Sequence, residues 1–161
     1  EVLGLSPAEV RGVGIRLQAS LSNTTPGTET YKVPSDQELV IFSIQGYLRL
    51  PTLATEPTTG MLSYLNLDPS ERWITKGQNC LVQLENIDRS LKVFDNAEIP
   101  LGAIMPPTGL PLNFPIEAPM LVPSTHILRG TFTLQDSTTA VVGNATIYGL
   151  LLSGALIPKR E

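Results

Sequence analysis

The chain has 161 residues, of which 42% are hydrophobic and 16% are charged, and its formal net charge is −4. This length suits one domain, which buries about two-thirds of the surface that its unfolded form exposes. The basic residues are scattered, and Lys159-Arg160 is the one adjacent pair. Since binding to phosphate backbones draws on a clustered basic face, we expect no direct contact with nucleic acid.

Two further classes of protein are excluded by the sequence. It contains no run of about 18 apolar residues, the length that suggests a transmembrane helix, and we expect no membrane partner. Cys80 is the one cysteine, which rules out an internal disulfide. Its apolar neighbours Leu81 and Val82 predict a buried, inert thiol. A domain of this size holds a core without a metal or cofactor, and we predict none.

The first segment, residues 1–12, shows no strand period, because Gly4 and Pro7 interrupt its apolar residues. Ordering each residue costs about 1–2 kcal/mol of backbone entropy, so the segment gains little by folding on itself. Apolar side chains that dock on a neighbour, at about 1.5–3 kcal/mol for each one buried, would offset this cost. We therefore predict an arm at 1–12 that contacts another subunit, and a folded domain at 13–161. The expected contacts of the arm are Val2, Leu3, Leu5 and Val10.

Strands follow the arm. Apolar and polar residues alternate over 15–21, as in a strand with one buried face. A Pro-Gly turn precedes a second strand at 30–33. The third run, 38–50, is long for one flat strand, and Gly46 is the expected place of a bulge or bend. Residues 81–93 carry both helical and strand spacing, and we expect strands broken near 86–89.

A proline-rich segment covers residues 100–123, where seven of 24 residues are proline. Proline bars most of this segment from central strands. Its high apolar content indicates that it is buried, either against its own domain or against a partner. We therefore add five residues of this segment to the candidate subunit contacts: Met105, Leu110, Leu112, Phe114 and Ile116.

The last third of the chain has the clearest pattern. Residues 127–134 alternate, and 139–158 form either a strand pair or one long bent strand. Residues 148–152 are apolar at both odd and even positions, so we expect this strand to be buried on both faces. About eight strands at these spacings predict an all-β fold, a single-domain jelly-roll-like β-sandwich or barrel.

Two stretches resemble parts of small viral and phage jelly-roll proteins. Residues 31–41, with Val33-Pro34 leading into Leu39-Val40-Ile41, resemble their opening strand. Residues 120–130, followed by 148–154, look like their closing strands. The resemblance implies a jelly roll of the kind used in capsid decoration (cement) proteins and fibre heads, which assemble as trimers or other oligomers without catalysis. An RNA-packaging shell protein is disfavoured, because its arm is usually basic and residues 1–12 are not.

Residues able to support catalysis are few. A Ser-His-Asp or Cys-His site would have to use His126, the one histidine, and no Gly-x-Ser-x-Gly turn is present. His126 is better explained as a surface or edge residue. A pair of acids such as Glu85 and Asp88 is normally solvated, and a calcium site built from loop acids is left open. We therefore expect no enzyme.

The function predicted from the sequence is structural. We expect a non-enzymatic virion protein, most simply a decoration protein on a phage shell that is assembled in the host cytoplasm. Its expected partners are copies of itself, with a trimer favoured, and other capsid or virion proteins. The alternative is a carbohydrate-binding or host-recognition module of a fibre. Such modules stack sugars on exposed aromatic rings, but aromatic residues make up only 6% of the chain, and we expect its single Trp73 to be buried.

Overall fold

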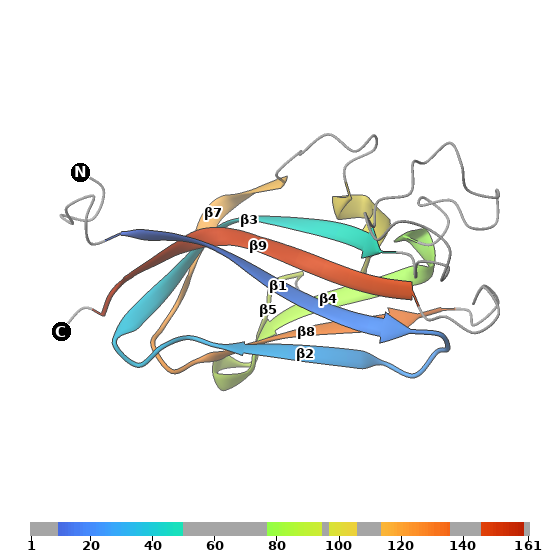
Figure 1. The fold of residues 1–161 in the computed structure, drawn as a ribbon, viewed down its shortest axis with the longest axis horizontal. Helices are drawn as coiled ribbons and strands as arrows, with labels where there is room; N and C mark the ends of the chain where they lie inside the picture. The colour runs from blue at the N-terminus through green and yellow to red at the C-terminus, as the bar shows by residue number, and fades with distance from the viewer. Residues whose placement is uncertain (1–9, 50–76, 95–96, 106–113, 136–145, 160–161) are drawn as a thin grey trace, which may run out of the picture.

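The computed structural model describes residues 10–49, 77–94, 97–105, 114–135 and 146–159, with residues 49 and 114–118 described in backbone only. These residues form two antiparallel sheets that pack face to face (Figure 1). The predicted all-β sandwich is therefore confirmed.

Each sheet is built from strands that are distant in sequence. Sheet A has the order β1 (Arg11–Leu21), β9 (Thr146–Pro158), β3 (Gln37–Arg49) and β7 (Phe114–Val122). Sheet B has the order β2 (Gly27–Lys32), β8 (Ile127–Leu134), β4 (Cys80–Asn86) and β5 (Leu91–Lys92), with β6 (Ile99–Pro100) also paired to β4. The described chain also contains two short 3-10 helices, η5 (Ile87–Arg89) and η6 (Leu101–Ile104), and helical residues at 77–79 just before β4.

Most of the predicted strands are found near their expected positions. The break expected near residues 86–89 is the turn η5, which separates β4 from β5. The last strand is β9, a single strand of 13 residues. The first strand begins at Arg11, which pairs with Leu156. The ladder therefore starts within the segment 1–12 that the sequence assigns to an arm, and residues 1–9 lie outside the described residues.

The bulge in β3 lies at Phe42, and the prediction of a bulge at Gly46 is wrong. The register of β3 against β9 shifts between Ile41 and Ser43, while Gly46 pairs regularly with Leu150. Gly46 is glycine for another reason. A Cβ atom there would lie 2.7 Å from a methyl group of Leu101, which is closer than packed carbon atoms approach. The missing side chain lets η6 pack against β3.

The last part of the proline-rich segment forms an edge strand, β7, in agreement with its composition. Pro115 and Pro119 both lie in β7, which is the outermost strand of sheet A. Proline has no N–H to donate to a further strand, so an edge strand is where a sheet tolerates it.

The interior lies between the two sheets. Sheet A contributes large side chains such as Leu17, Leu39 and Leu150, and sheet B contributes Leu84 and Phe132, all with 1% exposure or less. These residues belong to one continuous cluster. Burying each such side chain contributes about 1.5–3 kcal/mol, so the cluster is the main source of stability of the domain.

A matched pair of glycines tests the packing of sheet A. A Cβ atom at Gly154 would lie 2.1 Å from the carbonyl oxygen of Val40, whereas one at Gly12 would meet nothing within 4 Å. Gly154→Ala should therefore lower the free energy of unfolding by about 2 kcal/mol or more, because the backbone of β3 must move. Gly12→Ala should change it by less than about 0.5 kcal/mol. Urea denaturation of both variants checks this, and equal losses would contradict the close approach.

Candidate interaction surface

The predicted subunit contacts fall in different places. Val10 lies just before β1 and is 40% exposed. Met105 is buried in the protein's own interior, where it packs with Leu101 beneath β3, so it is not a surface residue. Phe114 and Ile116 lie in the edge strand β7. The remaining predicted contacts are outside the described residues: Val2, Leu3, Leu5, Leu110 and Leu112.

The outer face of sheet A turns away from sheet B and carries alternate residues of each strand. At one end, the hydroxyl of Tyr47 donates a hydrogen bond of 2.7 Å to Oε1 of Gln18. The ring of Tyr47 lies against Gly149, where a Cβ atom would come within 2.5 Å of three ring and hydroxyl atoms. Glycine is therefore required at 149 so that the ring can lie flat across β9.

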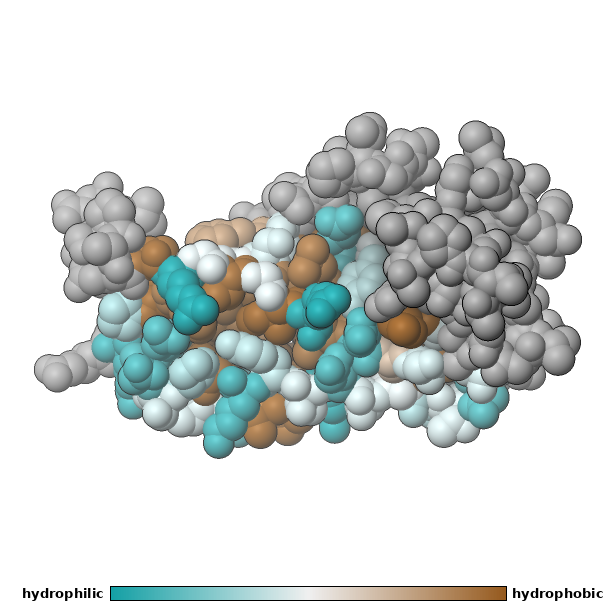
Figure 2. All heavy atoms as spheres, in the orientation of Figure 1, coloured by the Kyte–Doolittle hydropathy of each residue, from teal (hydrophilic) through white to brown (hydrophobic). Residues whose placement is uncertain are grey.

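Apolar residues lie among polar ones and glycines on the rest of this face, and we call five of the partly exposed ones the outer patch. They lie on β3, β7 and β9 and at the start of β1, and Val40 is paired in register with Leu121. Phe42 and Leu121 are each 50% exposed. Figure 2 views the molecule from this side and shows hydrophobic residues along the face between hydrophilic ones. The outer patch consists of Val10, Val40, Phe42, Leu121 and Leu151.

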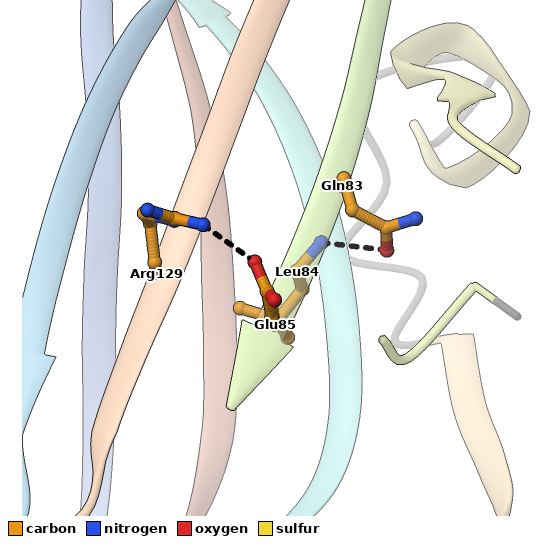
Figure 3. Close-up of polar contacts among 4 residues, drawn as sticks. All are labelled: Gln83, Leu84, Glu85 and Arg129. Atoms are coloured by element: carbon orange, nitrogen blue, oxygen red, sulfur yellow. Dashed lines mark hydrogen bonds and ion pairs between the residues drawn. The ribbon is translucent and has the colours of Figure 1, made fainter. Parts of the chain in front are cut away.

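The outer face of sheet B is polar by contrast. Its β8 residues alternate with the buried ones and include Arg129, Thr131 and Thr133. Arg129 forms an ion pair of 2.7 Å with Glu85 on β4 (Figure 3). Because both side chains are partly exposed, such a pair contributes no more than about 1 kcal/mol. The apolar residues of this face lie toward one end, where Ile127 starts β8 and where Ile87 and Leu91, 36% and 49% exposed, follow β4.

Gln83 has a structural role at the margin of sheet B. Its Oε1 accepts hydrogen bonds from the backbone N–H groups of Leu84, at 3.1 Å, and Phe94, at 3.3 Å, and its Nε2 donates to the carbonyl of Ala97 (Figure 3 shows the first). The side chain is 6% exposed. The bonds to Phe94 and Ala97 hold the chain after β5 against β4.

His126 is half-buried and joins the start of β8 to the end of β4. Its Nδ1 lies 3.1 Å from Nδ2 of Asn86, which is 2% exposed. Asp88 lies nearby and accepts a hydrogen bond of 2.7 Å from the N–H of Ile127. The ring of His126 thus contacts an amide, and the nearby carboxylate binds backbone. These contacts order a turn and do not form a Ser-His-Asp arrangement.

The chemistry of the described residues is otherwise sparse. Within them, no group of three or more His, Cys, Asp or Glu side chains is placed to hold a metal ion. Cys80 is fully buried, as its apolar neighbours predict, and burial raises the pKa of its thiol from 9.0 to about 12. Burial likewise raises the pKa of the Tyr148 hydroxyl to about 12. Both groups stay protonated and unreactive at neutral pH.

The buried thiol makes stability depend on alkaline pH. The folded chain holds the Cys80 proton more tightly than the unfolded chain does, so this contribution is complete below about pH 9 and is lost as the pH rises toward 12. Above pH 9 the free energy of unfolding should fall by up to about 1.4 kcal/mol per pH unit more in the wild type than in Cys80→Ala. Urea denaturation between pH 8 and about 10, before Tyr148 adds its own contribution, measures both slopes. Parallel slopes would contradict the assignment.

Comparison with known proteins adds no relative. No family model, no curated protein and no solved structure matches the chain. In the parts of the chain that the structure describes, no helix has the length and apolar character needed to cross a membrane.

Sequence reasoning missed the main residues of the outer patch. Leu39-Val40-Ile41-Phe42 is apolar at every position, and Leu121-Val122 is apolar at both. In a strand, successive side chains point to opposite faces, so such a run places apolar residues outside as well as inside. Consecutive apolar residues in an antiparallel sheet, which normally has one solvated face, are the signal that points to this surface.

Proposed function

We propose that the chain is a non-enzymatic structural protein of a virion, of the decoration or cement type, which works as a homo-oligomer bound to other capsid proteins. The observation that carries the proposal is the contrast between the two outer faces. Sheet A presents Phe42 and Leu121 on its outer face, each half exposed, while the outer face of sheet B presents mainly threonines and an ion pair, with the exposed apolar residues Ile87 and Leu91 at its margin. A monomer gains nothing from exposed apolar side chains, whereas an assembling subunit buries them.

The strand order supports a jelly roll. In sheet A the neighbours are β1, β9, β3 and β7, and in sheet B they are β2, β8, β4 and β5. The chain therefore crosses from one sheet to the other on going from β1 to β2, to β3, to β4, and again from β7 to β8 and β9. This interleaving is what two nested Greek keys produce, and jelly rolls of this kind serve in viral capsids and in lectins. The residues on the molecular surface are therefore needed to distinguish a capsid role from a lectin role.

The low charge of the chain favours assembly. Charged residues make up 16% of it, against about 25% in ordinary domains, and charged groups are depleted from the cores of protein interfaces. Net charge −4 and scattered basic residues favour protein partners over nucleic acid.

One feature favours the alternative, a carbohydrate-binding or host-recognition module. Phe42 is a half-exposed aromatic ring on the same outer face as Tyr47, and sugars stack on such rings. However, the ring of Tyr47 packs against Gly149, and its hydroxyl donates a hydrogen bond to Gln18. The ring therefore does not project from the face as a second platform for stacking sugars. Trp73 lies outside the described residues.

Solution mass tests the proposal directly. Sedimentation velocity and native mass spectrometry should show a discrete oligomer at micromolar concentrations, and the protein should bind shells that lack it, made by the virus whose genome encodes the chain. A protein that stays monomeric at every concentration and leaves such shells bare would contradict the assembly function. If that monomer also bound one class of glycan on an array, the carbohydrate alternative would replace it.

The arm gives a second prediction. Because β1 begins at Arg11, a deletion must end at residue 9 to leave its ladder intact. Removing residues 1–9 should weaken assembly and change the melting temperature of the monomeric form by no more than about 2 °C, a shift that corresponds to about 0.5–1 kcal/mol in a domain of this size. Replacing the same segment with a Gly/Ser sequence of equal length is the control for chain length. A large loss of melting temperature in the monomer would place the arm in the domain's own core instead.

A further inference from the structure

We propose that a second copy of this chain docks on the outer patch, so that two A sheets pack face to face about a twofold axis. The inference rests on the proposed assembly function and names the surface and the partner. In the pair, Arg16 of one protomer lies over Glu38 of the other, and the reverse contact is made at the same time.

Both edges of sheet A are partly blocked to strand pairing, which favours its face as the route of association. At the β1 edge, the backbone N–H of Gln18 donates to the carboxylate of Glu29, a residue of β2 in the other sheet. At the opposite edge, Pro115 and Pro119 interrupt the donors of β7. Charged groups and proline at edges are the devices by which sheets avoid strand addition. A neighbour is therefore expected to pack on the face, where apolar residues are exposed.

The charges on this face identify the occupant as another copy. Arg16 pairs in register with Leu151 of β9, and Glu38 pairs with Ile157. These positions are six residues apart along β9 (157 minus 151), which is about 20 Å of strand. Their parity matches that of the outward residues, and neither takes part in an ion pair among the described residues, where Arg129–Glu85 is the pair found. Opposite charges at opposite ends of an apolar patch make the surface complementary to itself.

Twofold symmetry brings the apolar residues together as well. The twofold axis lies in the plane midway between the two A sheets and is perpendicular to the line from Arg16 to Glu38. Rotation about this axis places Arg16 of each protomer over Glu38 of the other. The axis passes over β9 near Gly154, beside the bulge that holds Phe42, and so brings the two Phe42 rings close to each other. A twofold interface uses the same patch on both subunits and closes on itself. The pair is therefore finite, and a trimer that used this contact would become a hexamer.

Charge-reversal variants test the pairing. Arg16→Glu alone and Glu38→Arg alone each place like charges opposite one another twice, and each should weaken self-association at least about tenfold, since opposed like charges cost several kcal/mol. An equimolar mixture of the two variants should associate again, because both cross contacts become opposite pairs. The double variant R16E/E38R should associate like the wild type. Sedimentation equilibrium measures the dissociation constants, and native mass spectrometry identifies the mixed pair.

Three controls separate the possible outcomes. Lys32→Glu reverses a charge on exposed β2 of sheet B and should leave association unchanged, while Phe42→Asp should abolish it. Melting temperatures near that of the wild type show that each variant is folded. An oligomer that all of the sheet A variants leave intact overturns the pairing but keeps the assembly function, whereas a strict monomer that leaves shells bare overturns both. Association that is lost on removing residues 1–9 but unchanged by the charge variants assigns the patch to the arm, and this also overturns the pairing.

Discussion

The structure depends on the close approach of β3 to β9 at Gly154. Here the carbonyl of Val40 occupies the place where any other residue would carry its Cβ atom. That approach coincides with the single-residue bulge at Phe42 in β3. A bulge adds one residue to one strand and so reverses its alternation. Before the bulge, Leu39 and Ile41 point inward, and after it Ile44 does. Without it, the second half of β3 would turn its apolar residues to the outside. One glycine thus lets one long strand fill the interior along its whole length.

The same bulge adds Phe42 to the outer patch. The extra residue has no place in the ladder, and in this strand it is Phe42, half exposed beside Val40. On sheet B, β8 runs without a register shift against β4, its alternation is unbroken, and its outer residues after Ile127 are polar. The difference between the two faces therefore arises from backbone geometry as much as from composition. A side chain that the fold could have left polar at little cost is instead aromatic, which is what an interface residue requires.

Periodicity predicted the sandwich well because it depends on local alternation, which β1 and β8 follow almost perfectly. It also found the break after Asn86, where polar residues replace the apolar ones. The position of the bulge escaped it, since the tight contact that demands Gly46 comes from Leu101, more than fifty residues away in the chain. The sequence wrongly assigns Met105 to the subunit contacts for a similar reason. The apolar residues of a proline-rich segment have no periodic spacing that distinguishes buried positions from exposed ones. The burial of Met105 follows from its tertiary packing against Gly46 and Gly77.

A β-sandwich that assembles must expose one surface that binds a neighbouring subunit without exposing several such surfaces. Open strand edges carry the greater risk of aggregation, because any extended chain can pair with them and the aggregate can continue to grow. In this protein the Glu29 carboxylate, which accepts a hydrogen bond from the backbone N–H of Gln18, and the prolines of β7 restrain both edges of sheet A, and the apolar exposure of this sheet lies mainly on its flat face. A partner recognises the face of a sheet by its shape and by the positions of its charges, so binding to a face can be selective. Arg16 and Glu38, at the two ends of the patch, would reject a copy docked in the parallel direction, since like charges then meet. On this reasoning the few charges of sheet A act mainly by setting the orientation of the neighbour, and the apolar residues between them supply most of the affinity.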